Sequence, residues 1–225
     1  MRKYFFYVLI LFFLLLNNSC KKSEIIFPKV IDTTMIGKIK TVIILGNSIV
    51  RCGPDPNLGW FGDWGLDASI QENDFVHILI RNLQSKDNRI IVKFKNIADF
   101  ELNSVTFPLR SVDTLRNADM IVMKIGENVK AAVDPNYSQF ISNYDKLIKY
   151  LDPTNQAVKL IVDGFWNNTL VNNDIRNYAL TKKYPLISIT DLSSVSKNKG
   201  LAGHPNDQGM RQIADRIWAY ISNYF

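Results

Sequence analysis

The sequence predicts an α/β domain, built as a three-layer α/β/α sandwich around a central parallel sheet of about five strands. Short, mostly apolar segments rich in β-branched residues alternate with longer segments in which apolar residues recur at helical spacing. Strands that are apolar along their whole length indicate a sheet covered on both faces, and the intervening helices provide the crossovers that parallel strands need. The 225 residues, of which 47% are hydrophobic, suffice for one such core.

The expected elements follow one another in regular alternation. The first strand reads Thr-Val-Ile-Ile-Leu and is ended by Gly46, and the helix after the third strand is stopped by Asp152 and Pro153. The strands are expected at 41–45, 90–94, 119–125, 158–162 and 186–189. The helices are expected at 71–85, 137–151, 171–183 and 208–224.

Residues 1–20 are typical of an export signal. Arg2 and Lys3 form a charged start, and an unbroken apolar run follows over 4–16. A span of the bilayer core, which is about 30 Å thick, needs about 20 residues, so this run is too short to cross it. It matches the apolar core of a secretory signal peptide instead.

The end of this segment, Ser19-Cys20, resembles the lipobox of bacterial lipoproteins, in which the cysteine is acylated. The resemblance implies lipidation of Cys20, attachment to a lipid bilayer and a place in the exported cell envelope; a plain signal peptide is the alternative. Residues 21–38 are then expected to tether a domain of residues 39–225. With Cys20 lipidated, Cys52 remains as a lone thiol, and no cysteine and histidine spacing indicates a metal.

The charge pattern argues against a nucleic-acid partner. The formal net charge is +6, but the basic residues are spread singly or in short pairs, without a stripe interleaved with aromatic residues.

Candidate catalytic residues follow the expected strands, whose carboxyl ends meet at one edge of a parallel sheet. The turn 46–48 can present the Ser48 hydroxyl there, but a serine is a weak nucleophile without a base. Of the two histidines, His77 lies in an apolar helical run and is expected to pack, whereas His204 lies in a glycine-rich loop. Asn128, after the third strand, can donate its side-chain amide to a developing oxyanion.

Three segments together resemble the SGNH (GDSL-like) hydrolase superfamily. The resemblance covers roughly residues 40–225 and implies a flavodoxin-like α/β fold and hydrolysis of carboxylic esters without a metal or organic cofactor. It implies Ser48 as nucleophile, His204 as base, and an oxyanion hole formed by the backbone N–H groups of Ser48 and Ala98 and the Asn128 side chain. The matching segments are Gly46-Asn47-Ser48, Gly126-Glu127-Asn128-Val129 and His204-Pro205-Asn206-Asp207-Gln208-Gly209-Met210.

One departure from the family pattern concerns the histidine. Leu201 stands where the family has an aspartate, three residues before His204. Either Ser48 and His204 act as a dyad, with a backbone carbonyl accepting from the imidazole N–H, or a carboxylate from elsewhere orients the ring. Glu127 and Asp163 are the candidates for such a carboxylate.

The aromatic residues near the expected site bear on the substrate. Trp60, Trp64 and Trp166 either line a cleft and stack on sugar rings or close the end of the sheet. A lipid-anchored esterase with an aromatic cleft is expected to remove acetyl or other small acyl groups from glycans. The alternatives are a catalytically weak or inactive glycan-binding lipoprotein of the same fold and a lipase or lysophospholipase. Leu201 and Val129 favour the first alternative, since each stands where the family pattern has an aspartate.

Overall fold

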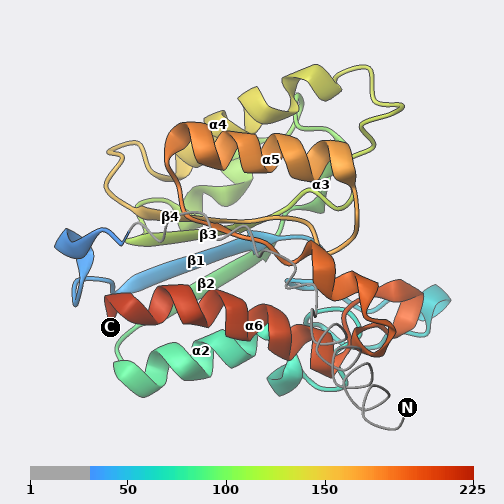
Figure 1. The fold of residues 1–225 in the computed structure, drawn as a ribbon, viewed down its shortest axis with the longest axis horizontal. Coiled ribbons are helices and arrows are strands. Elements are labelled where there is room, and N and C mark those ends of the chain that lie inside the picture. Colours follow the sequence, from blue (N-terminus) through green and yellow to red (C-terminus); the bar gives the residue numbers. More distant parts are fainter. Residues whose placement is uncertain (1–30) are drawn as a thin grey trace, which may run out of the picture.

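The computed structural model describes residues 31–225, which form a parallel sheet between two layers of helices (Figure 1). The strand order is β2-β1-β3-β4-β5, as expected for a three-layer α/β/α sandwich. The strands are β1 (Thr41–Gly46), β2 (Ile91–Asn96), β3 (Met120–Lys124), β4 (Val158–Val162) and β5 (Leu186–Ile187). The helices are α2 (Phe75–Lys86), α3 (Ala98–Leu102), α4 (Phe140–Leu151), α5 (Thr169–Lys182) and α6 (Asp207–Ile221).

The apolar strands are explained by burial on both faces. Helices α2 and α6 cover one face of the sheet, and α3, α4 and α5 cover the other (Figure 1). Successive side chains of a strand point to opposite faces, so Val42 and Ile44 of β1 join the core on one side, while Ile43 and Leu45 join the core on the other. All four side chains are fully buried.

Local hydrogen bonding explains why α2 begins later than periodicity predicts. Asp74 has an extended backbone, and its side chain accepts a hydrogen bond from the His77 N–H at 2.7 Å, which caps the helix. Residues 71–73 form a separate 3₁₀ turn before this cap. His77 packs at its other side against the ring of Phe94.

Helix α3 was not predicted. It has five residues, little more than one turn, which is too short for a helical period to be visible in the sequence. The chain is fixed in front of it by a hydrogen bond from the Ile97 N–H to the Gly46 carbonyl at 2.6 Å. This contact brings α3 beside the end of β1.

Residues 31–38 belong to the domain, although they were expected to be part of a tether. Ile31 and Met35 pack against the core, and the Gly37 N–H donates to the Tyr224 carbonyl at 2.7 Å. The expected export signal, Cys20 and the rest of the expected tether lie outside the described residues. Within residues 31–225, no helix is long and apolar enough to cross a membrane.

The turn after β1 requires a glycine because of close packing. A β-carbon at Gly46 would lie 2.7 Å from the Lys124 carbonyl oxygen and closer still to a methyl group of Val50. Backbone cannot yield as a flexible side chain would, so β1 and β3 would have to separate. The absence of a side chain therefore allows the two strand ends to approach where Asn47 and Ser48 begin.

Gly46→Ala is expected to lower the free energy of unfolding by about 2–3 kcal/mol, because overpacking of a close contact costs this much. Urea unfolding followed by circular dichroism measures the change. Gly53→Ala is the control, since a β-carbon there would meet only Asp63, 4.0 Å away, and it should change stability by less than about 1 kcal/mol. Equal effects of the two substitutions would contradict this account of Gly46.

Candidate active site

The structure brings Ser48 and His204 together from opposite ends of the chain. Ser48 lies in the turn after β1, which is held by a hydrogen bond of 2.9 Å from the Val50 N–H to the Asn47 carbonyl. His204 lies in the loop before α6. The Ser48 Oγ is 3.0 Å from the His204 Nε2, which is within hydrogen-bonding distance. A hydroxyl and an imidazole are thus paired, as nucleophile activation requires.

A backbone carbonyl orients the His204 ring. Its Nδ1 lies 3.2 Å from the carbonyl oxygen of Leu201. A carbonyl can only accept, so this contact requires the proton on Nδ1 and leaves Nε2 as an acceptor for the Ser48 hydroxyl. Leu201 replaces the family's aspartate in the sequence, yet its main chain selects the tautomer that a carboxylate would select.

Burial of His204 favours its neutral form. Desolvation lowers the pKa of the imidazole, and the positive charge of Lys124 lowers it further, against the opposing effects of the Leu201 carbonyl and Glu127. The edge of Trp166 packs on the ring, with the two ring centres 4.8 Å apart. The Trp166 indole N–H donates to the Gly203 carbonyl at 3.0 Å, which fixes the loop next to the histidine.

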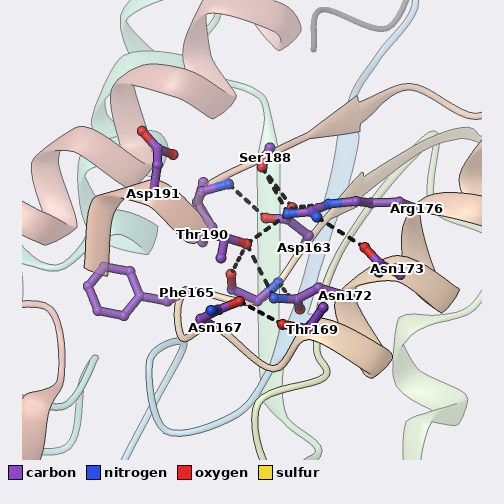
Figure 2. Close-up of polar contacts among 12 residues, drawn as sticks. Asp163, Phe165, Asn167, Thr169, Asn172, Asn173, Arg176, Ser188, Thr190 and Asp191 are labelled. Atoms are coloured by element: carbon purple, nitrogen blue, oxygen red, sulfur yellow. Dashed lines mark hydrogen bonds and ion pairs between the residues drawn. The ribbon is translucent and has the colours of Figure 1, made fainter. Parts of the chain in front are cut away.

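Asp163, one of the two carboxylates considered for His204, is committed to another network (Figure 2). Its Oδ2 accepts from the Arg176 Nε at 2.8 Å and from the Ser188 hydroxyl at 2.8 Å, and its Oδ1 accepts from the Ile189 N–H at 2.7 Å. These bonds tie β4, α5 and the end of β5 together. No hydrogen bond or ion pair of Asp163 with His204 is found among residues 31–225, so these bonds do not orient the imidazole.

Glu127, the second carboxylate considered, is also committed elsewhere. Its side chain is fully buried and forms an ion pair with Lys124, which is equally buried. It also accepts from the Asn47 side-chain amide at 2.7 Å and from the Phe165 N–H at 2.9 Å. Like Asp163, it makes no hydrogen bond or ion pair with the imidazole within the described part of the chain, although its charge acts on the His204 pKa.

The expected oxyanion hole is only partly assembled. The Ala98 N–H donates to the Asn96 Oδ1 at 2.8 Å, and the Asn128 Nδ2 donates to the Glu101 Oε2 at 2.5 Å. For the Ser48 N–H, no acceptor is found among residues 31–225. The Asn96 side chain thus occupies the N–H group that Ala98 was expected to contribute to the oxyanion hole.

The tryptophans expected in a cleft divide between two roles. Trp60 is buried, its N–H donates to the Cys52 carbonyl at 2.9 Å, and its ring packs edge-on against Trp64. The Trp64 N–H donates to the Ala68 carbonyl at 2.8 Å. A buried ring cannot stack on a sugar, so the cleft interpretation does not fit Trp60, whereas Trp166 lies beside His204.

The fold of this chain is similar to the folds of several solved structures. Residues of this chain superpose on the psychrotrophic esterase EstA from Pseudoalteromonas sp. with a TM-score of 0.59 at 17% identity, covering 82% of this chain and 98% of that chain. The chain has the SGNH hydrolase fold. No family model and no curated protein matches the sequence.

Two further structures with the SGNH fold are similar. One is a variant of Axe2, an acetyl xylan esterase from Geobacillus stearothermophilus, with a TM-score of 0.54 at 12% identity, covering 85% of this chain and 98% of that chain. The other is a two-domain esterase, CEX, active on acetylated mannans, with a TM-score of 0.54 at 16% identity. In that case 82% of this chain matches 49% of the other, since CEX has a second domain.

Two residues near Ser48 and His204 were missed by sequence reasoning. Glu101 lies in the unpredicted helix α3. Asp67 lies next to the loop that carries His204: a β-carbon at Gly200 would be 2.9 Å from the Asp67 Oδ1. Asp67 has a positive φ of 80°, and its Oδ2 is buried without a hydrogen-bond partner among residues 31–225. Desolvation raises the pKa of its carboxyl, while the N–H groups of Leu201 and Gly200 oppose the rise. Neither residue belongs to a recognisable motif.

Lys124→Met is expected to lower the free energy of unfolding by about 3–5 kcal/mol, because it leaves the Glu127 carboxylate buried and unpaired. The double variant with Glu127→Gln should recover part of this loss. Lys93→Met is the control, since its ammonium group lies at the exposed edge of the sheet. Urea titration of the four proteins tests this; equal stability of the Lys124 and Lys93 variants would contradict the buried pair's importance.

Proposed function

We propose that this protein is a serine esterase that hydrolyses O-acyl esters, with Ser48 as nucleophile and His204 as general base. The observation that carries the proposal is the chain of contacts from the Ser48 Oγ through the imidazole to the Leu201 carbonyl, at 3.0 and 3.2 Å. The fold shared with esterases supports it.

The mechanism follows from these contacts. The Ser48 Oγ attacks the ester carbonyl carbon while the His204 Nε2 takes its proton, and the Leu201 carbonyl stabilises the Nδ1–H of the resulting imidazolium. His204 then protonates the leaving alcohol, and the acyl group stays on Ser48. A water molecule, deprotonated by His204, attacks the acyl-enzyme, which releases the carboxylic acid and restores the hydroxyl.

Charge on the tetrahedral intermediate needs hydrogen-bond donors. The Ser48 N–H is one donor in this proposal, and the Asn128 side-chain amide is the second. The contact of that amide with Glu101 instead favours the second candidate function, a catalytically weak or inactive glycan-binding protein of the same fold. In the esterase this contact must open so that the Asn128 amide can reach the oxyanion, whereas in the glycan-binding protein it stays closed.

Acetylated glycans are the substrate class we propose. Structural neighbours of this chain are an acetyl xylan esterase and an esterase active on acetylated mannans. Trp166, half-buried beside the imidazole, offers an aromatic surface for a sugar ring. A lipase or lysophospholipase would instead prefer long acyl chains, so the rates on aryl esters of increasing chain length separate the two.

Ser48→Ala is expected to reduce hydrolysis of aryl acetates and acetylated oligosaccharides by about 10³-fold or more, because the nucleophile is lost. Ser85→Ala, which changes an exposed serine of α2, is the control and should keep the wild-type rate. Equal rates for the wild type and Ser48→Ala would refute the esterase. If neither protein hydrolyses any ester but both bind glycans on an affinity column, the binding function is correct.

We further propose that Cys20 carries a lipid that anchors the protein in the exported cell envelope. The Ser19-Cys20 segment after an apolar run supports this. In cells given labelled palmitate, the full chain should take up label and fractionate with membranes, whereas Cys20→Ala should not be labelled. Cys52→Ala is the matched control and should behave as the wild type; labelling that persists in Cys20→Ala would disprove the anchor.

A further inference from the structure

The Glu101 side chain joins the nucleophile turn to the loop after β3. It is 2% exposed and accepts every hydrogen bond it makes. Its Oε1 accepts from the Asn47 Nδ2 at 3.0 Å, from the Glu127 N–H at 3.1 Å and from the Gly126 N–H. Its Oε2 accepts from the Asn128 Nδ2 at 2.5 Å and from the Asn47 Nδ2 at 3.2 Å. A single buried carboxyl group therefore holds both the residue before Ser48 and the proposed oxyanion donor.

The surroundings of Glu101 make its charge costly. Glu127, a second carboxylate, faces it from the loop after β3, and the ion pair with Lys124 engages Glu127. Tyr144 of α4 faces the two carboxylates, and its hydroxyl is buried without a partner among residues 31–225. Desolvation and the repulsion by Glu127 raise the pKa of Glu101 to about 7, against the lowering effect of its hydrogen bonds.

The two asparagines that contact Glu101 differ in their freedom to rotate. The Asn47 Oδ1 accepts from the Ile49 N–H at 3.1 Å, which fixes that amide with its NH₂ toward the carboxyl group. For the Asn128 side chain, the contact with Glu101 is the one hydrogen bond found among residues 31–225. The two ends of a carboxamide have nearly the same shape, so a half-turn exchanges donor for acceptor without repacking.

We propose that Glu101 sets the orientation of the Asn128 carboxamide and is thereby a positioning residue for ester hydrolysis, an inference that rests on the proposed function. As a carboxylate, Glu101 can only accept, so it holds the Asn128 NH₂ group. As a carboxylic acid, it donates its Oε2–H to the Asn128 Oδ1, and the NH₂ group turns to the opposite side of the amide. In that orientation it is available to the oxyanion at Ser48.

A pH dependence follows, with its sign fixed by the chemistry. Below a pH of about 7 the acid form of Glu101 prevails and the Asn128 NH₂ group is available, whereas above it the carboxylate withdraws this donor. His204 must be neutral to act as a base, and because burial lowers its pKa, it becomes neutral at a lower pH than an ordinary imidazole does. The reaction rate should therefore rise through the pKa of His204 and fall through that of Glu101.

Glu101→Gln imitates the acid form at every pH. The glutamine Oε1 can accept from the Gly126 and Glu127 N–H groups, and its NH₂ group, in place of Oε2, can donate to the Asn128 Oδ1. Asp99→Asn is the matched control, because it makes the same chemical change on the exposed side of α3. The two variants separate the buried carboxyl group from a general loss of charge.

The first test measures the rate of covalent labelling of Ser48 by a fluorophosphonate between pH 5 and 9. Wild type and Asp99→Asn should lose about tenfold in rate per pH unit above 7, because the competent fraction falls by that factor. Glu101→Gln should lack this fall and exceed the wild type about 100-fold at pH 9. A wild-type rate that does not fall above pH 7, or a parallel fall in Glu101→Gln, would overturn the proposal.

A second measurement tests the amide rotation without any reaction. The side-chain ¹⁵N–¹H₂ signals of Asn128, identified by their loss in Asn128→Ala, should shift in the wild type with a midpoint near pH 7. Unchanged signals across this range would overturn the proposal, and the wild type alone suffices if Glu101→Gln does not fold. If Ser48 is not labelled at any pH while the Asn128 signals titrate, the proposed function fails and the coupling of Glu101 to Asn128 stands.

Discussion

The close approach of parallel strand ends is the constraint on which the site depends. A parallel sheet brings the carboxyl ends of all its strands to one edge, and β1 and β3 come near enough there that no β-carbon fits at Gly46. Residues that follow the two strands must then share a small volume. Asn47, Ser48, Glu127 and Asn128 meet for this reason, although about 80 residues separate the two pairs along the chain.

Ion pairing and hydrogen bonding must satisfy the polar groups that this approach buries. Lys124 and Glu127 neutralise each other, and Glu101 is surrounded by backbone N–H groups and amides. Buried charges are stable only when they are paired and hydrogen-bonded, and the bonds of this cluster to Asn47 hold the turn that carries Ser48. The cluster of Lys124, Glu127 and Glu101 holds one more carboxyl group than ammonium groups. Glu101 can therefore gain or lose its proton as the pH changes.

The histidine shows how main chain can replace a missing side chain. The family's aspartate selects a tautomer and stabilises the imidazolium; the Leu201 carbonyl at 3.2 Å performs the first task as an acceptor. It carries no full charge, so it stabilises the imidazolium less than a carboxylate does. The hydrogen bond from the Trp166 N–H to the Gly203 carbonyl holds the loop that carries both the histidine and this carbonyl group.

The sequence by itself determined the layered α/β fold, because apolar runs and helical periods report burial directly; β4 was predicted at its observed bounds. It also determined the pairing of Ser48 with His204, since residues after strands and in a glycine-rich loop are displayed at one edge. Only the tertiary structure decided which group orients His204, that Asn96 occupies the Ala98 N–H, and that Glu101 holds Asn128. The segments that these contacts join carry no periodic pattern in the sequence. Which buried donor meets which buried acceptor is decided only when the chain has folded and several of them lie within reach of one another.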